Sequence, residues 1–166
     1  MAQSGAPFGF KVTQRILALR ATYDIIDVAT GDTVFIAKRR MFTWTPTIII
    51  ENLRGQEVVK VKSNFFFGNR WKITQGPNLI GEIEFPIIKF CGIQFDVMLA
   101  GNHYTASDLI GWSFKAVGRD GSIGFTLNKK FRIRDTYTVD VYPPLEPLYG
   151  LAAVLAIDSK FYQSNR

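Results

Sequence analysis

Four cationic residues lie close together in the stretch VVKVKSNFFFGNRWKI, residues 58 to 73. Lys60 and Lys62 precede three phenylalanines, Arg70 and Lys72 follow them, and no acidic residue lies between. Ammonium and guanidinium groups make charge-assisted hydrogen bonds to phosphate oxygens, so this composition suits a phosphate-bearing ligand. The sequence therefore indicates Lys60, Lys62, Arg70 and Lys72 as candidate residues for binding lipid phosphate.

The spacing of these cations predicts a hairpin with a charged face. Residues two apart on a strand share a face, which separates each basic pair from the apolar residues between them. We expect Val61 to lie opposite Trp71, because that register buries both apolar sets together. The four cations then form two cross-strand pairs of like charge: Lys62 with Arg70, and Lys60 with Lys72. Each pair destabilises the sheet by about a few tenths of a kcal/mol, which a bound anion would relieve.

Two interpretations of this hairpin stay open. The charged face is either a phosphate site or a solvated outer surface whose charge Glu82 or Glu84 neutralises from a neighbouring strand. The aromatic residues between the arms pose a similar choice, since three consecutive side chains cannot all point inward on a regular strand. Phe65, Phe66 and Phe67 either contact a membrane interface beside the cations or fold over the end of the domain as a lid.

Residues that could support catalysis are few and badly placed. His103, the single histidine, lies in the polar stretch AGNHYTAS, and neither a catalytic triad nor a Gly-x-Ser-x-Gly elbow is present. Cys91, the single cysteine, lies in an apolar run that favours a buried, inert thiol. The acids around Gly31 are interpreted as turn residues, because no metal-binding spacing is found. We therefore expect a non-enzymatic protein without a metal or cofactor.

The overall composition is that of a folded, basic protein of 166 residues with 47% hydrophobic residues and a formal net charge of +6. The positive excess suits a polyanion such as phosphate head groups, although many basic domains have no such partner. A single cysteine excludes an internal disulfide, which is compatible with the cytoplasm. The N-terminus has no secretory signal, and Ala2 excludes the myristoylation motif. We expect a cytoplasmic protein that associates peripherally with membranes.

Short stretches rich in Val, Ile, Phe, Thr and Tyr recur between turn signals, a pattern typical of an antiparallel all-β domain. Gly, Asn and Pro mark turns at ATGD, ENLRGQ, QGPN and GRDG. The predicted strands are Ile16 to Leu19, Tyr23 to Asp27, Val34 to Lys38, Thr47 to Glu51, Val58 to Lys62, Arg70 to Thr74, Ile80 to Phe85, Gln94 to Leu99, Ile110 to Val117, Ser122 to Leu127 and Tyr137 to Val141.

The chain changes character after Pro143 and Pro144, where Leu148 to Ile157 is apolar on every side. A helix that is hydrophobic all round must be enclosed. The charge-free run from Pro147 to Ile157 is roughly 16 Å long at about 1.5 Å per residue, against about 30 Å for a bilayer core, so no transmembrane span is expected. The sequence predicts one domain over residues 1–166: a closed antiparallel β-barrel around this helix, with residues 1–9 and 162–166 flexible.

Two segments resemble one superfamily. The end of the chain, DTYTVDVYPPLEPLYGLAAVLAIDSKF, resembles the C-terminal part of tubby proteins. VKVKSNFFFGNRWKI is similar to the tubby Lys-x-Arg-Ser-Asn strand and to a strand pair of the LURP-one-related family, the type that YDIIDVATGDTVFIA also favours. The resemblance implies a barrel of about twelve strands around a central hydrophobic helix, the fold also inferred for phospholipid scramblases.

The resemblance also implies a ligand. Tubby domains bind phosphoinositides through a basic pair that corresponds to Lys60 and Lys62, with Ser63 and Asn64 completing the motif. Lys62 stands where the tubby motif has arginine, which removes bidentate phosphate geometry. A further tubby arginine on a Gly-Pro-Arg-Lys stretch has no counterpart around residues 91 to 95.

Three functions follow from these observations as hypotheses. The first is binding of phosphoinositide or another anionic lipid at the membrane surface. The second is a structural barrel, or one that binds a protein partner, without a lipid site. The third is scramblase-like lipid handling. The basic stretches from Lys38 to Arg40, before Trp44, and NKKFRIRDT at 128 to 136 are interpreted as solvated loop and strand surface, and no nucleic-acid partner is expected because stacking motifs are absent.

Overall fold

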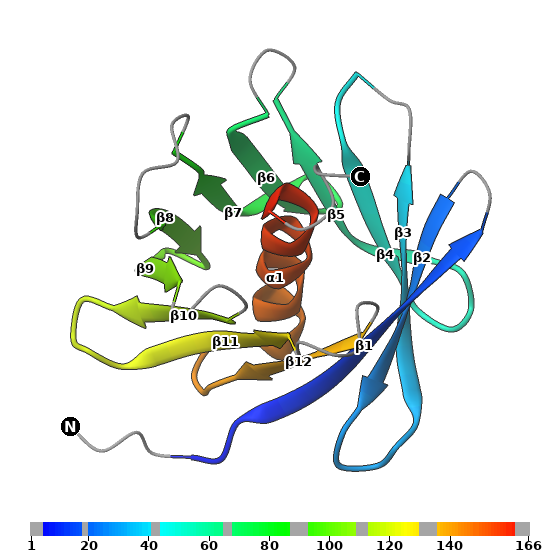
Figure 1. Cartoon of the computed structure of the whole chain (residues 1–166), viewed down its shortest axis with the longest axis horizontal. Helices are drawn as coiled ribbons and strands as arrows, with labels where there is room; N and C mark the ends of the chain where they lie inside the picture. The colour runs from blue at the N-terminus through cyan, green and yellow to red at the C-terminus, as the bar shows by residue number, and fades with distance from the viewer. Residues whose placement is uncertain are drawn as a thin grey trace.

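A computed structural model describes residues 5–17, 20–40, 44–64, 68–86, 93–108, 113–129 and 136–161, with the backbone alone at 16, 17 and 20. Twelve antiparallel strands form a closed barrel around one helix (Figure 1). The strands are β1 (Phe8–Leu17), β2 (Arg20–Asp27), β3 (Thr33–Arg40), β4 (Thr47–Glu51), β5 (Glu57–Ser63), β6 (Arg70–Gln75), β7 (Asn78–Glu84), β8 (Gln94–Leu99), β9 (Asn102–Asp108), β10 (Ser113–Gly118), β11 (Ile123–Lys129) and β12 (Thr136–Val141).

Each strand pairs with its neighbours in the sequence, and β1 pairs with β12 to close the barrel. Phe8 lies opposite Val141 in that closing pair. Strand alternation sorts the side chains, as β5 illustrates: Val59 and Val61 are fully buried, whereas Lys62 is exposed. Closure leaves the barrel without a free sheet edge, which removes a route to aggregation. The predicted fold class is confirmed.

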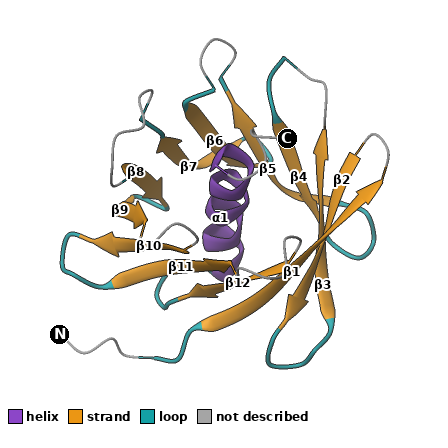
Figure 2. Cartoon of the chain, viewed as in Figure 1, coloured by secondary structure: helices purple, strands orange, loops and turns teal. Residues whose placement is uncertain are grey.

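The helix α1 (Pro147–Phe161) lies inside the barrel, surrounded by strands on all sides (Figure 2). Its residues from Gly150 to Ser159 are all buried, as expected for a segment that is apolar all round. Pro147 occupies the first helical position, where the missing N–H leaves no hydrogen bond unmade. Among the described residues, no helix combines the length and the hydrophobicity that a bilayer span requires.

Aromatic side chains fill the barrel around the last turn of the helix. The ring of Phe161 stacks on that of Phe114 with a centroid separation of 5.4 Å and meets the edge of Phe85 at 5.3 Å. Phe95 lies between these rings. Lys160 donates a hydrogen bond of 2.9 Å to the carbonyl oxygen of Gly68, so the end of the helix is joined to the connection between β5 and β6.

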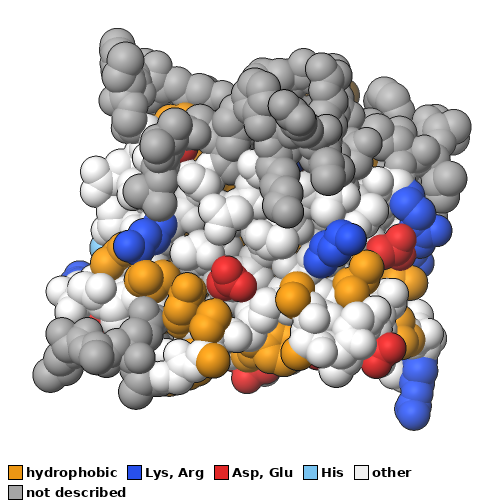
Figure 3. Space-filling view, turned by 60° about the horizontal axis from the view of Figure 1, so that its bottom comes forward, with side chains coloured by type: hydrophobic (Ala, Val, Ile, Leu, Met, Phe, Trp, Pro, Cys, Tyr) orange, Lys and Arg blue, Asp and Glu red, His pale blue; other side chains and the backbone are white. Residues whose placement is uncertain are grey.

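The two ends of the barrel differ in composition. The helix enters at the end formed by the turns that follow β2, β4, β6, β8 and β10. Five large hydrophobic side chains are exposed at or next to this end: Phe8, Val28, Leu53, Leu79 and Met98. Figure 3 shows hydrophobic side chains gathered on the side of this end, with both acidic and basic side chains among them. We call it the turn end, and we call the opposite end, where α1 finishes, the hairpin end.

Most predicted strands match the observed ones, with three differences. β1 begins at Phe8, eight residues before its predicted start and inside the stretch expected to be flexible. β9 was interpreted as a polar loop around His103, and it is a strand. The helix continues past Ile157 to Phe161. Residues 162–166 lie outside the described part of the chain.

Candidate functional site

The predicted hairpin exists as β5 and β6, and its four cations all point away from the core. Val61, Trp71 and Ile73 are buried on the inner face. Gly68, with a φ of +57°, begins the return of the chain, and its carbonyl oxygen accepts a hydrogen bond of 3.0 Å from Nε1 of Trp71. The buried indole of Trp71 therefore holds the carbonyl group of Gly68 in place just before β6.

The predicted register of this hairpin is wrong by two residues. Val61 lies opposite Ile73 instead of Trp71, so Lys62 lies opposite Lys72 and Lys60 lies opposite Thr74. A shift of two keeps every side chain on its own face, so the hydrophobic pattern cannot distinguish the two registers.

Hydrogen bonds of the hairpin connection fix the register. The amide of Asn64 donates a hydrogen bond of 2.8 Å to the carbonyl oxygen of Arg70, and the amide of Arg70 donates one of 3.2 Å to Oδ1 of Asn64. These bonds set Asn64 opposite Arg70, and the pairs behind them follow.

Acidic neighbours neutralise two of the four cations. Nε of Arg70 lies 3.0 Å from a carboxylate oxygen of Glu82, and its Nη2 lies 3.5 Å from one of Glu84. Nζ of Lys60 lies 3.5 Å from a carboxylate oxygen of Glu57. The solvated-surface interpretation anticipated this arrangement for Arg70, while Glu57 was not considered.

Lys62 and Lys72 remain without such partners. Both side chains are exposed, and neither makes an ion pair or side-chain hydrogen bond with the residues that the structure describes. They face each other across the ladder. In the same row, Thr47 separates Lys62 from the exposed Arg40, and Glu82 of β7 lies opposite Lys72 on the other side. Like charges opposite each other destabilise a sheet, so this pair would gain from an anion bound between the two ammonium groups.

Several predicted residues lie outside the described part of the chain: Phe65, Phe66, Phe67, Cys91 and the basic stretch 130–135. His103 is described and lies on the outer face of β9, where its Nε2 is 3.0 Å from Oδ1 of Asp96. Among the described residues, no three His, Cys, Asp or Glu side chains gather as metal ligands would.

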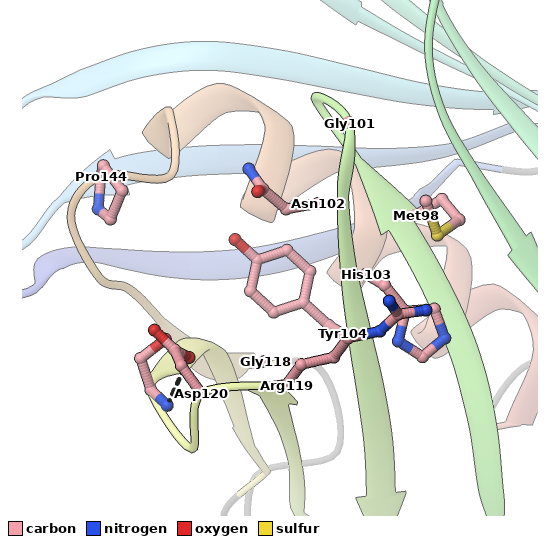
Figure 4. A pocket seen from close by; sticks show the side chains of 10 residues that line it. Met98, Gly101, Asn102, His103, Tyr104, Gly118, Arg119, Asp120 and Pro144 are labelled. Carbon is pink, nitrogen blue, oxygen red and sulfur yellow. Dashed lines mark hydrogen bonds between the residues drawn. The ribbon is translucent and has the colours of Figure 1, made fainter. Parts of the chain in front are cut away.

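Sequence reasoning missed a polar hollow of about 430 Å³ at the turn end (Figure 4). Tyr104, Arg119 and Asp120 line it together with Asn102. Burial, and to a lesser extent the charge of Asp120, raises the pKa of the Tyr104 hydroxyl, which stays protonated as a donor. Hydrogen bonds from Ser122 lower the pKa of Asp120. The opposite charges of Arg119 and Asp120 offset each other, and the hollow was overlooked because β9 was not predicted.

A model of the LURP-one-related family matches residues 9–158, almost the whole barrel and its helix. The chain belongs to the LURP-one-related family. No curated protein matches this LURP-one-related chain.

One solved structure similar to this LURP-one-related chain is an X-ray structure of a protein from Arabidopsis thaliana. The two share 18% sequence identity and superpose with a TM-score of 0.63, covering 97% of this chain and 94% of the other. At that identity the likeness establishes the fold alone. The family match confirms the expected LURP-one-related membership, and the structural likeness agrees with the barrel described above.

The LURP-one-related barrel also contains a buried ion pair that the sequence did not reveal. Nζ of Lys129 on β11 lies 2.6 Å from Oδ1 of Asp158 on α1, and their side chains are 9% and 1% exposed. Lys129 also lies over the ring of Tyr137. Burial first, then the charge of Asp158, raises the pKa of the Tyr137 hydroxyl well above its ordinary value. These groups join the helix to the wall of the barrel and are inaccessible to a ligand outside it.

Proposed function

We propose that this LURP-one-related domain is a non-enzymatic module that binds phosphoinositide or another anionic lipid at the membrane surface. The observation that carries the proposal is the pair formed by Lys62 and Lys72, which face each other on the outer face of the barrel and make no ion pair with any residue that the structure describes. Two ammonium groups on directly opposed strand positions can approach one phosphate from two sides.

The four predicted cations contribute unequally in this proposal. Arg70 is held by two glutamates and Lys60 by one, so a lipid phosphate would have to compete with these carboxylates. Lys62 and Lys72 make no ion pair with the described residues, although Glu82 lies opposite Lys72 in the ladder, and these two lysines would supply most of the attraction. A lysine near an anionic leaflet contributes about 1 kcal/mol, so the pair supplies roughly 2 kcal/mol, a gain of about thirtyfold in affinity.

Flotation of the whole chain with liposomes tests the proposal. Liposomes of phosphatidylcholine alone are compared with liposomes that also contain a phosphoinositide or phosphatidylserine, which separates phosphoinositide recognition from general attraction to negative charge. We expect Lys62→Ala/Lys72→Ala to weaken binding to the anionic liposomes by about thirtyfold. A matched control, Lys11→Ala/Lys115→Ala, removes the same charge from β1 and β10.

The control variant should bind within about threefold of the wild type, because its lysines lie on other faces of the barrel. The proposal is wrong if the wild type binds none of the anionic liposomes, or if the Lys62/Lys72 variant binds as well as the control.

A second candidate function is a protein-interaction barrel without a lipid site. The ion pairs of Arg70 with Glu82 and Glu84 favour it, since they leave part of the hairpin neutral. Retained folding together with a complete absence of liposome binding would select this alternative. Scramblase-like lipid handling is tested with dye-labelled lipids in the same liposomes, and we expect no scrambling because α1 is enclosed by the barrel.

A further inference from the structure

Trp44 is the most exposed large hydrophobic side chain of the described residues, with 86% of its surface accessible. Trp71, by contrast, is 2% exposed and packs in the core. An indole exposed to this extent keeps most of its large apolar surface available for burial, which would release free energy. Trp side chains are enriched at membrane interfaces, where the ring lies among apolar groups while its N–H meets polar head groups.

The position of Trp44 in the chain brings it near Lys62 and Lys72, the two hairpin lysines that make no ion pair with the described residues. It precedes β4 by three residues, and Thr47, the first residue of β4, lies directly opposite Lys62. The amide of Ser63, which follows Lys62, donates a hydrogen bond of 3.0 Å to the carbonyl oxygen of Pro46. Three extended residues span at most about 10 Å, so the indole lies at the hairpin end within reach of the surface that Lys62 and Lys72 would contact.

Charge distinguishes this end from the opposite one. The exposed Arg40 lies in the same row as Lys62 and Lys72. At the turn end, the exposed Val28 stands in a turn bordered by Asp27 and Asp32, which an anionic leaflet would repel. The exposed Leu53 lies between Glu51, which pairs with Lys38, and the exposed Arg54. An exposed indole beside unneutralised cations is the combination that an anionic membrane interface attracts.

We propose that Trp44 is the membrane-interface anchor of this domain, inserting between lipid head groups while Lys62 and Lys72 hold the phosphates. The inference rests on the proposed function and extends it, because it fixes the orientation of the barrel. The hairpin end meets the membrane, and the acidic turn end faces away from it.

The test combines binding with tryptophan fluorescence, using liposomes of phosphatidylcholine and phosphatidylserine with and without brominated acyl chains, which quench nearby indoles. In the wild type, we expect a blue shift of emission and quenching by the brominated lipid. Trp44→Phe should lose most of that quenching. Trp44→Ala should weaken binding at least tenfold, since burial of a quarter of an indole's roughly 200 Å² is sufficient for that effect.

A matched control is Leu53→Ala, which removes an exposed hydrophobic side chain from the turn end and should leave binding unchanged. If the wild type binds but Trp44→Ala binds equally well, or if the quenching persists in Trp44→Phe, the anchor is refuted while lipid binding stands. If Leu53→Ala weakens binding as much as Trp44→Ala, the orientation is refuted. If the wild type does not bind, the proposed function fails and the anchor fails with it.

Discussion

Replacement of Gly150 by alanine tests how closely the helix approaches the barrel wall. Gly150 lies in the first turn of α1 against β12. A methyl carbon at position 150 would lie 2.6 Å from Cγ2 of Val141, 2.7 Å from Cγ1 and 3.3 Å from Cβ. Favourable carbon contacts lie at about 3.5 to 4.0 Å, so both methyl groups of Val141 would have to move by roughly 1 Å.

Two opposing effects set the size of the change. Alanine is about 1 kcal/mol better than glycine in a helix interior. Overpacking a well-filled core costs about 1 to 3 kcal/mol, and Val141 is 1% exposed with a stiff, β-branched side chain that cannot turn aside. The clash therefore exceeds the gain, and we expect Gly150→Ala to lower the free energy of unfolding by up to about 2 kcal/mol. For a chain of this size, that corresponds to a fall in Tm of roughly 4 to 8 °C.

Urea and thermal unfolding followed by circular dichroism measure the effect, with Val141→Ala as the matched background. Removing the Val141 methyl groups relieves the clash, so Gly150→Ala should stabilise the Val141→Ala protein by about 1 kcal/mol, the helix-propensity gain alone. An increase in Tm for Gly150→Ala in the wild-type background would refute the close approach of α1 to β12.

Three other substitutions give distinct results in the same unfolding assays. Gly124→Ala should cost about 1 to 3 kcal/mol, because its methyl carbon would lie 2.5 Å from Cε1 of Tyr104; an unchanged Tm would contradict that packing. Tyr137→Phe should keep or raise stability at pH 7, since the buried hydroxyl has no hydrogen-bond partner in the part of the chain that the structure describes. The pKa of the Tyr137 hydroxyl is raised in the folded state, so above about pH 10 the hydroxyl ionises more readily in the unfolded chain than in the folded one. The free energy of unfolding should therefore be unaffected by this group below about pH 10 and should fall above it. That fall should be smaller in Tyr137→Phe, as Tm measured against pH would show. Lys62→Thr should raise stability by about a few tenths of a kcal/mol at low salt by removing the charge opposite Lys72, and an equal gain at high salt would exclude an electrostatic cause.

The strands were predictable wherever inward and outward residues differ in polarity. β4 and β8 have the predicted bounds, because large apolar residues fill their inner face. β9 was missed because Ala106, one of its inward residues, is small, and the outward His103, Thr105 and Ser107 are polar. A barrel that holds a helix needs small inward side chains in places, and a hydrophobicity pattern cannot distinguish such a strand from a loop.

The length of the helix at its polar C-terminal end was underestimated for a related reason. Asp158 and Lys160 were taken as the residues where the apolar segment ends, and both continue it as helix. Asp158 is compatible with burial because Lys129 reaches it from the barrel wall. That partner lies 29 residues earlier in the chain, and a contact of this kind follows from the topology instead of the local sequence.

The charged hairpin shows where inference from a single sequence stops. Alternation correctly placed Lys60, Lys62, Arg70 and Lys72 on one outer face. The charge that remains on that face depends on register and on the neighbouring strand, which together assign glutamates to Arg70 and none to Lys62. Neither of these long-range contacts is encoded in the spacing of the cations.

The pairing of β1 with β12 has a consequence for how the protein is made. The two strands that close the ring are separated by almost the whole barrel sequence, and the helix that fills the ring follows β12. A ribosome therefore releases eleven strands before the closing strand and the filling helix exist, and each of those strands has an apolar face without its final cover. The nascent barrel must remain open until synthesis has passed Phe161, so we expect chaperones to be needed during translation more than afterwards.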